Sequence, residues 1–370
     1  MSRLRMGVIG AGSWALSSHL PAFARRADEL DFVGVARHGA EVLEQVREHY
    51  GFVVASEDYR DVLNAGVDVC LIASPTGLHH EHAKAAMEAG AHVLVEKPFT
   101  IDPADAWDLV ATAERLDRHL VVAFGWNYKP MVRALERLVL EHGIGTVEQV
   151  SVTMASVTRD LLSNTGAYPD AAPEAVPERR TWTDPLLSGG GYGQAQLSHA
   201  LGLALRLTGL RGESAFALMS APGGAPVELH DAIAVRYRGG AIGTVAGGSA
   251  HEGAGGNKHQ LEVRAIGSNG QLQLDVEREI AWLWTDNGRV DVRIPVHDGD
   301  GAYDCEGPPN TLVDLALGRT VENHSPGELA ARTVELLDAA YRSARSGRLE
   351  AVSDQRDGGA AAANSPTSRA

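Results

Sequence analysis

The chain has 370 residues, of which 44% are hydrophobic and 22% charged, so it can form two domains and bury a core without metal or disulfide support. Its formal net charge of −15 repels phosphate backbones and anionic membrane surfaces, which excludes general nucleic-acid and lipid partners and leaves small molecules. With two cysteines, no apolar stretch long enough to span a membrane and a first apolar run too short for a signal peptide, the chain is expected to be cytoplasmic.

The first 125 residues alternate short apolar runs with longer segments of helical period, a pattern typical of a parallel sheet wrapped by helices. Two of the helices have clear limits. One follows Asp102 as N-cap and carries Pro103 in its first turn, and the other covers residues 81–89 and ends at Gly90. The predicted strands cover residues 6–10, 32–36, 69–73, 92–95 and 120–124.

Beyond residue 145 the pattern changes to alternating apolar and polar residues, which predicts an open, largely antiparallel sheet. Residues 163–187 form a long loop, rich in proline and alanine, ahead of a glycine cluster. A final helix is expected from Ser325, because residues 325–328 match a capping box. The predicted strands of this half cover residues 147–157, 232–237, 261–266 and 280–284. The predicted tight turns cover residues 267–270 and 286–288.

These patterns predict an α/β fold with two domains. Residues 1–125 form a Rossmann dinucleotide-binding domain, and residues 126–350 form an α+β domain with the open sheet, for substrate binding and oligomerisation. Residues 351–370 lack large apolar side chains and are expected to be a disordered tail. Because a sheet with one face uncovered by helices needs a partner, we expect a homodimer or homotetramer.

The first strand leads into Gly10-Ala11-Gly12-Ser13-Trp14-Ala15, a G-x-G-x-x-A turn that opens a helix. The first glycine permits a tight turn, the second lets a pyrophosphate approach the backbone, and the small third residue lets the helix pack on the strand. The phosphates would then meet the helix N-terminus. The alternative is a tight turn without a ligand, but the position in the first βαβ unit favours cofactor binding by Gly10, Gly12, Ser13 and Trp14.

The second strand ends in Ala36-Arg37-His38, where NAD-specific proteins usually place an acid against the ribose hydroxyls. Here the acid is missing. Arg37 can pair with the 2′-phosphate of NADP, with His38 as a second donor, so NADP is the favoured cofactor and NAD the alternative. Arg37 could also be an ordinary solvated surface arginine.

Two further clusters follow predicted strands, at the edge where open α/β sheets bind ligands. They are Ser74-Pro75-Thr76 with His79, and Glu96-Lys97-Pro98, and all of these residues except Pro98 are expected at the cofactor. Together with the glycine turn, Gly125-Trp126-Asn127-Tyr128 and the glycines at 189–191 that lead to His199, these motifs resemble the Gfo/Idh/MocA oxidoreductase family over nearly all of residues 1–350. That family includes glucose-fructose oxidoreductase and inositol dehydrogenase.

The resemblance implies a Rossmann domain and an open mixed-sheet domain that often self-associates through the sheet. It also implies that Lys97 reaches both the nicotinamide ribose and the substrate hydroxyl, and that the following proline is often cis. A lysine can act as acid or base only if burial or a nearby positive charge lowers its pKa, and an oxidised nicotinamide supplies such a charge. The alternative for Lys97 is an exposed lysine at a strand end.

A helix beginning near Gly191 carries His199, with Gln196 one turn earlier on the same side. The resemblance places an aspartate four residues before this histidine, but this chain has Ala195, so the usual Asp–His pair is broken. We expect Lys97 and His199 to be the catalytic residues, with His199 neutral because no carboxylate at position 195 raises its pKa. The alternative is a packed histidine without a catalytic role.

Aromatic rings beside these motifs can pack against a sugar ring, although core packing explains any single one equally well. The histidines at 79, 80 and 82 do not predict a metal site, because one helical turn offers at most two ligands and no third partner is evident. No metal is expected. The predicted substrate contacts are Trp126, Asn127, Tyr128, Trp182 and Gln196.

The sequence therefore predicts an NAD(P)-dependent oxidoreductase that moves a hydride to or from a hydroxyl or ketone of a sugar, cyclitol or sugar-derived compound. Two alternatives remain open. A regulator could keep the cofactor site without chemistry, which Ala195 favours and Lys97 opposes. An enzyme with a tightly held cofactor could cleave or epimerise a glycoside through transient oxidation.

Overall fold

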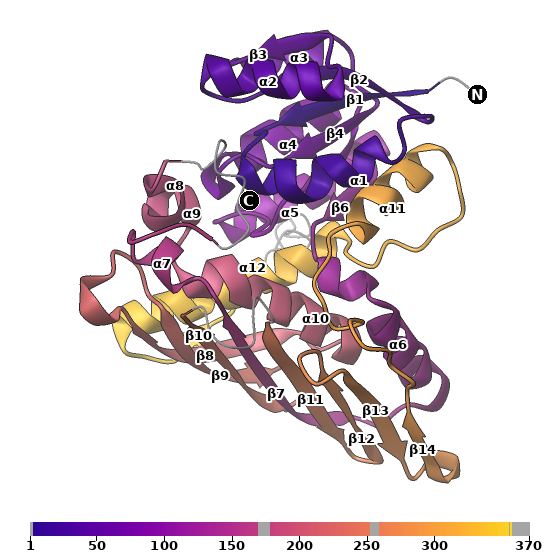
Figure 1. The fold of residues 1–370 in the computed structure, drawn as a ribbon. Helices are drawn as coiled ribbons and strands as arrows, with labels where there is room; N and C mark the ends of the chain where they lie inside the picture. The colour runs from indigo at the N-terminus through magenta and orange to yellow at the C-terminus, as the bar shows by residue number, and fades with distance from the viewer. Residues whose placement is uncertain (1–2, 169–177, 252–258, 355, 357–370) are drawn as a thin grey trace, which may run out of the picture.

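A computed structural model describes residues 3–168, 178–251, 259–354 and 356, which contain two sheets (Figure 1). The first sheet has six strands in the order β3-β2-β1-β4-β5-β6, and all neighbours pair in parallel. This is the strand order of a dinucleotide-binding Rossmann fold. Its strands are β1 (Leu4–Ile9), β2 (Leu30–Ala36), β3 (Val54–Ser56), β4 (Val69–Ile72), β5 (His92–Val95) and β6 (Leu120–Val122).

Helices connect these strands and cover both faces of the sheet. The two helices with predicted limits are confirmed: the carboxylate of Asp102 accepts from the Ala104 N–H at 2.7 Å at the start of α5, and Gly90 follows α4 with a φ of +100°. The short strand β3 was not predicted. The helices of this half are η1 (Ala15–His19), α1 (Leu20–Ala24), α2 (Ala40–Tyr50), α3 (Tyr59–Asn64), η2 (Thr76–Leu78), α4 (His79–Glu88) and α5 (Pro103–Leu116).

The second sheet has nine strands in the order β14-β13-β12-β11-β7-β10-β9-β8-β15. Its described neighbours pair antiparallel, except that β10 runs parallel to β7. The four predicted strands and both predicted turns are present. The strands are β7 (Val147–Ser156), β8 (Gly212–Ser220), β9 (His230–Tyr237), β10 (Ile242–Ser249), β11 (Gln260–Gly267), β12 (Gly270–Asp275), β13 (Ile280–Thr285), β14 (Val290–Arg293) and β15 (Glu350–Ala351).

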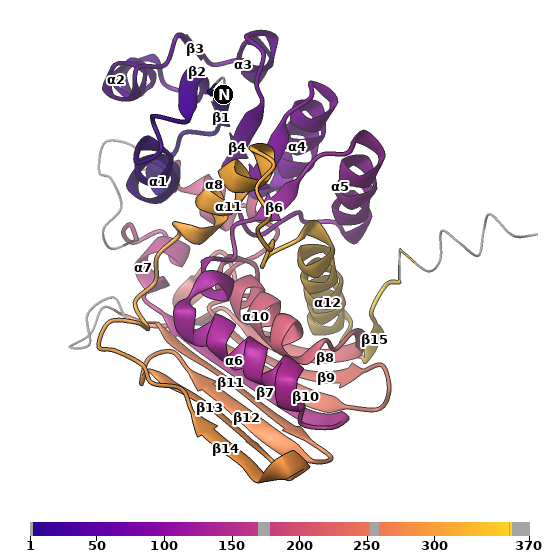
Figure 2. The same ribbon diagram turned by 90° about the vertical axis from the view of Figure 1, so that its right-hand side faces the viewer.

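Helices α6 (Pro130–His142), α10 (Ser198–Thr208) and α12 (Gly327–Ser346) cover the face of the second sheet that is turned toward the first sheet, and no described helix covers the opposite face (Figures 1 and 2). The predicted fold class, a Rossmann sheet plus an open, largely antiparallel sheet, is confirmed. The remaining short elements are η3 (Gly125–Tyr128), α7 (Arg159–Leu162), α8 (Arg180–Thr183), α9 (Pro185–Ser188), η5 (Gly193–Leu197), η6 (Pro222–Gly224), η7 (Asn287–Arg289) and α11 (Gly307–Ala316).

The predicted capping box at Ser325 is wrong. Helix α12 begins two residues later, with Pro326 at the N-cap and no side-chain cap. The reason is that Ser325 lies alongside β6, where its carbonyl accepts from Val122 N–H at 2.9 Å and its hydroxyl lies 2.8 Å from Tyr128 Oη. Its side chain is therefore buried in the protein and not available to the helix end.

The C-terminal half returns to the first sheet. Helix α11 packs against it, and Cys305, Leu312 and Val313 are buried in the same core as β1. Ala351, the first residue of the predicted disordered tail, lies in β15; residues 355 and 357–370 of that tail are outside the described residues, as are residues 169–177 of the predicted long loop. Within the described residues, no helix combines the length and apolar character needed to cross a bilayer.

Candidate active site

The glycine turn after β1 leaves room for a ligand. Gly10 has a φ of +92°, and a Cβ there would lie 2.3 Å from Ser74 N, so only glycine fits. A Cβ at Gly12 would meet no atom within 4 Å, which leaves the backbone open at that point. The turn continues into helical residues 13–24, which include η1. A dinucleotide pyrophosphate fits such an open backbone before a helix.

Arg37 lies across this turn at the end of β2. Its Nη1 donates to the Ala11 carbonyl at 3.1 Å, and its Nε donates to the His38 carbonyl at 3.0 Å. The His38 side chain is exposed. The nearby Gly39 N–H donates to the Glu57 carboxylate at 2.8 Å, so an acid lies close to this end of the turn.

His79 joins the two strand-end clusters. One ring nitrogen, Nε2, lies 2.7 Å from the Ser74 carbonyl, and the other, Nδ1, lies 2.9 Å from the Pro98 carbonyl. The ring is buried and lies between the turn that follows β4 and the turn that follows β5, and it contacts both. The Lys97–Pro98 peptide is cis.

The three neighbouring histidines bind different partners. His79 faces backbone carbonyls, His80 Nε2 lies 2.7 Å from Asp108, and His82 Nδ1 lies 2.9 Å from Ser74 Oγ. They do not converge on one point. Burial lowers the pKa of His82 to about 4, so this ring is neutral at ordinary pH.

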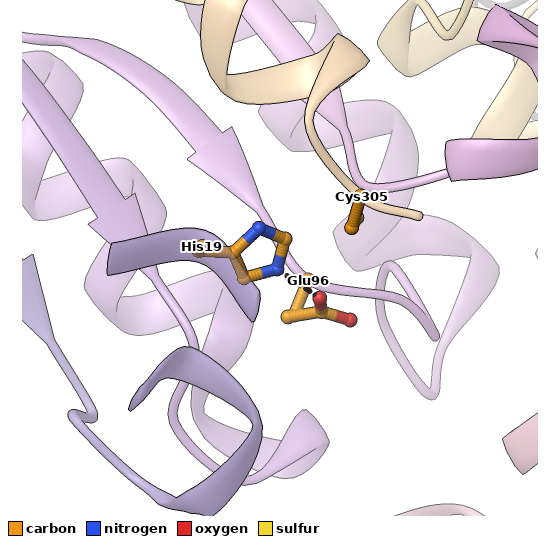
Figure 3. Close-up of side chains that lie close together, drawn as sticks. All are labelled: His19, Glu96 and Cys305. Atoms are coloured by element: carbon orange, nitrogen blue, oxygen red, sulfur yellow. Dashed lines mark hydrogen bonds and ion pairs between the residues drawn. The ribbon is translucent and has the colours of Figure 1, made fainter. Parts of the chain in front are cut away.

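Glu96 is held by a group of buried side chains (Figure 3). Its Oε1 accepts from Trp14 Nε1 at 2.9 Å and contacts His19 Nε2, and its Oε2 accepts from the Lys97 N–H at 2.8 Å. Burial acts to lower the pKa of His19, but Cys305 and Glu96 outweigh it and raise the pKa to about 10. Hydrogen bonds to His19, Trp14 and its own backbone neighbour thus fix the carboxylate at the start of the Glu-Lys-Pro turn.

The ligand atoms of His19, Glu96 and Cys305 lie within 4.8 Å of one another, and this donor set suits zinc. Both carboxylate oxygens are already hydrogen-bonded, however, and His19 contacts Glu96 directly. Two ligands of one zinc ion lie farther apart than a hydrogen-bonded pair, because each stands about 2 Å from the metal. The geometry is that of a hydrogen-bonded support, and these side chains do not fit a metal without rearrangement.

Lys97 connects the two halves of the site. Its Nζ donates to the Ala195 carbonyl, in η5, at 2.8 Å. Burial lowers the pKa of Lys97, while the nearby Glu96 and Cys305 oppose that shift. The ammonium is therefore held at the boundary between the carboxyl end of β5 and the helix that carries His199.

His199 lies in α10 and is 4% exposed. Its ring centroid lies 5.5 Å from that of Tyr303 and 6.2 Å from that of Phe124. Burial, the charge of Lys97 and the nearby His259 lower the pKa of His199 well below its ordinary value, so the imidazole is neutral. The structure thus brings the two predicted catalytic residues into one electrostatic environment.

Aromatic rings form one wall of this environment. Trp126 is buried, and its ring centroid lies 4.7 Å from that of Tyr303 and 5.8 Å from that of His259. Tyr303 also stacks on Trp14 at 6.0 Å. Of the predicted substrate residues, Trp126 is the one that these ring contacts join, through Tyr303, to His199.

The other predicted substrate residues lie elsewhere or deeper. Asn127 Nδ2 donates to the His324 carbonyl at 3.0 Å, and Tyr128 Oη contacts Ser325, so both side chains face the segment before α12. Trp182 packs from α8 against the core of the second sheet. Gln196 is buried in η5. The first three are therefore accounted for by packing within the protein.

Five residues of the site were not predicted from the sequence: His19, Tyr168, His259, Tyr303 and Cys305. Tyr168, His259 and Tyr303 lie in irregular segments next to the second sheet, with no motif around them. His19 is in the helix after the glycine turn, ten residues beyond the strand end. The one available signal was that polar His19 occupies a helix position flanked by apolar residues.

Residues 4–124 match the model of a family described as an oxidoreductase family with an NAD-binding Rossmann fold, GFO_IDH_MocA. The D-glucoside 3-dehydrogenase of Escherichia coli (strain K12) is 30% identical over 191 residues, which are 51% of this chain and 50% of that protein. The UDP-N-acetylglucosamine 3-dehydrogenase of Acidithiobacillus ferrooxidans is 37% identical over 131 residues, 34% of this chain and 37% of that protein. The chain thus matches half or less of the length of these two relatives.

The similarity in structure extends over almost the whole chain. A solved structure of levoglucosan dehydrogenase in complex with NADH and levoglucosan has a TM-score of 0.76 at 19% identity, and the match covers 95% of this chain and 100% of that one. At this identity the match establishes the fold alone. The family match confirms the resemblance that the sequence motifs indicated over residues 4–124, and the likeness in structure shows that the fold of the remaining residues is shared.

Proposed function

We propose that this chain, with a Rossmann domain of the Gfo/Idh/MocA oxidoreductase family, is an NAD(P)-dependent oxidoreductase acting on a CH–OH group of a sugar, cyclitol or sugar-derived compound. The observation that carries the proposal is the position of Lys97. Its ammonium lies at the carboxyl end of β5, hydrogen-bonded to η5 and next to the neutral His199 and a wall of aromatic rings. The names of the two dehydrogenase relatives support the substrate class.

The dinucleotide is expected along the carboxyl ends of the first sheet. Gly10, Gly12, Ser13 and Trp14 would face its phosphates, and Arg37, with His38, would face a 2′-phosphate, so NADP is the preferred form. When bound, the nicotinamide supplies the hydride acceptor or donor. Every other part of the reaction depends on protein side chains.

Lys97 is the residue that holds the reacting oxygen and its proton. Burial lowers the pKa of Lys97, which makes transfer of a proton between Nζ and a substrate hydroxyl easier than for an exposed lysine. Glu96 fixes the backbone N–H of Lys97 and thereby orients the turn. His199 is neutral and can accept or donate one hydrogen bond at the same substrate oxygen.

The substrate is a polyhydroxylated ring. Trp126 is 1% exposed and packs against Tyr303, which is half-buried and contacts His199, so Tyr303 is the ring that can pack against the C–H face of a sugar or cyclitol. The nitrogen groups of Lys97 and His199 would bind its hydroxyls. This division of apolar and polar contacts is typical of ligand sites with a few placed polar groups.

A screen of sugars, cyclitols and their keto forms, followed by the absorbance of the reduced nicotinamide, tests the proposal. With the substrate found, Lys97→Met should lower kcat by roughly 100-fold or more, because proton transfer is lost, while the cofactor still binds. Lys84→Met is the matched control, since Lys84 binds Asp108 on the surface, and should leave kcat unchanged. Near-normal turnover of Lys97→Met, or no turnover with any compound, would contradict the proposal.

A further inference from the structure

His259 brings a second imidazole to this site from a different part of the chain. It lies directly before β11, whose first residue, Gln260, pairs with Ala155 near the end of β7. The His259 ring is 9% exposed, and its centroid lies 5.8 Å from that of Trp126 and 6.1 Å from that of Tyr303. His259 therefore contacts the same two rings that line the wall beside Lys97 and His199.

Electrostatics place His259 close to the reacting groups. Burial and then the charge of Lys97 lower the pKa of His259 to about 4. The pKa of His199 is lowered by burial, by Lys97 and by His259. Three basic side chains, one that follows β5, one in α10 and one that precedes β11, thus influence one another, and both imidazoles are neutral at neutral pH.

The hydrogen bonding of His259 leaves one ring nitrogen available. Its Nε2 lies 3.3 Å from Tyr168 Oη, and a phenol that donates to Nε2 places the imidazole proton on Nδ1. Nδ1 is buried and has no hydrogen-bond partner among the described residues, and the same holds for Nδ1 of His199. Buried polar atoms of this kind normally have a partner, so a ligand is expected to supply one.

The side chain at position 195 cannot form a hydrogen bond with the substrate. The side chain of Ala195 is a methyl group, and its backbone carbonyl is taken by Lys97 Nζ at 2.8 Å. A second hydrogen bond to a substrate held by Lys97 must therefore come from another residue. Of the described side chains, His259 shares its ring contacts with the site and has a free nitrogen.

We propose that His259 is a substrate-binding residue whose Nδ1–H donates a hydrogen bond to an oxygen of the bound polyol, next to the groups that Lys97 and His199 contact. This inference rests on the proposed function, because it assigns the ligand as the oxidoreductase substrate. The chemical class that fits is a ring with oxygens on adjacent carbons, since one oxygen is held by Lys97 and a second must reach His259.

Two variants separate hydrogen bonding from packing. His259→Phe keeps a ring against Trp126 and Tyr303 but removes the donor, and should lower kcat/KM at least 10-fold, mainly through KM. His259→Asn places an amide N–H near the position of Nδ1 and should recover a clear part of that loss. His230→Phe, which changes a half-buried histidine of β9 outside the site, is the matched control and should leave kcat/KM within twofold.

A binding measurement makes the result independent of turnover. Calorimetry of the screened polyol with NADP-loaded Lys97→Met should show weaker binding when His259→Phe is added, with NADP affinity unchanged. Polyol binding that depends on His259, without any turnover in the native chain, would overturn the proposed function and leave this inference standing. Native-like kcat/KM in His259→Phe, or equal losses in His259→Phe and His259→Asn, would overturn the inference.

Discussion

In the proposed cofactor site, Arg37 lies beside the glycine turn and donates to the Ala11 carbonyl. Its guanidinium is half-buried and keeps two of its donors on backbone carbonyls, which leaves the rest of the fork for a ligand. A 2′-phosphate gains a charge-assisted hydrogen bond there, whereas the free diol of NAD gains none. The proposed preference for NADP therefore rests on one residue.

Arg37→Asp should reverse that preference. A charge-assisted hydrogen bond contributes about 1.5–3 kcal/mol, so NADP affinity should fall on the order of 10- to 100-fold relative to NAD. Titration of both cofactors, followed by nicotinamide or tryptophan fluorescence, measures this. Arg60→Asp changes a surface arginine and serves as control. Equal affinities in the native chain, or an unchanged ratio in Arg37→Asp, would show that another group selects the cofactor.

The site residues that could be predicted from the sequence share one property, because each lies next to a recognisable local motif. Gly10 and Lys97 follow strand ends directly, and His199 follows a glycine cluster. His259 and Tyr303 have no such pattern, and only the pairing of β11 with β7 and the return of the chain toward α11 bring them to Lys97. Asn127 also lies in a motif, and its amide donates to the His324 carbonyl, so its predicted contact with the substrate stays a prediction.

Among the elements, the helical segment that carries His199 begins next to two acidic residues, Glu228 and Asp231. Glu228 accepts from the N–H groups of Gly191 at 2.8 Å and Gly193 at 3.1 Å, at the start of that helix. Asp231, in β9, is 5% exposed, and neither of its carboxylate oxygens has a hydrogen-bond partner among the described residues. Burial and the neighbouring Glu228 raise the pKa of Asp231 to about 8.

Asp231→Asn should stabilise the protein more at pH 9 than at pH 5. The folded pKa lies above the unfolded value, so the native carboxyl contributes stability below the unfolded pKa and loses it as pH rises through about 8. Asparagine does not ionise and avoids this loss, which amounts to about 1.4 kcal/mol per unit of pKa shift. Thermal unfolding at pH 5 and pH 9 measures the difference, and an equal effect at both pH values would rule out this cause.

The elements also show which local features a pattern cannot predict. Residues 15–19 and 193–197 form π-turns within longer helices, and both lie at the candidate site, where such turns often occur. Over five residues, the spacing of apolar side chains does not distinguish a π-helical segment from an α-helical one. Strand β10 was missed because its Gly243, Gly247 and Gly248 interrupt the apolar alternation.

At the level of the whole molecule, the face of the second sheet that no described helix covers carries exposed apolar side chains (Figure 2). Several large apolar side chains on its strands are exposed, whereas the opposite face packs against the helices in a hydrophobic core. Such a face is stabilised when a second copy of the chain covers it. The exposed side chains are Phe216, Leu218, Ile242, Ile266 and Trp284.

Light scattering should therefore give a homodimer or homotetramer at micromolar concentration. Leu218→Glu, on this face, should lower the mass toward that of a monomer, because it buries a charge in the contact. Leu140→Glu, at an even more exposed leucine on the outer side of α6, is the control and should leave the mass unchanged. A native chain that is monomeric at this concentration contradicts the prediction.

We propose that a hydride moves directly between the nicotinamide and a substrate carbon while Lys97 transfers the proton. Transfer of deuterium from the cofactor to the substrate tests this reaction. The keto form of the compound found in the screen is incubated with NADPH deuterated at the reactive C4 position, and the product is analysed by mass spectrometry. We expect one deuterium on the new carbinol carbon for each NADPH oxidised, and roughly 100-fold less of this product with Lys97→Met in the same time. Product without deuterium, or cofactor binding with no transfer to any compound of the panel, would contradict it.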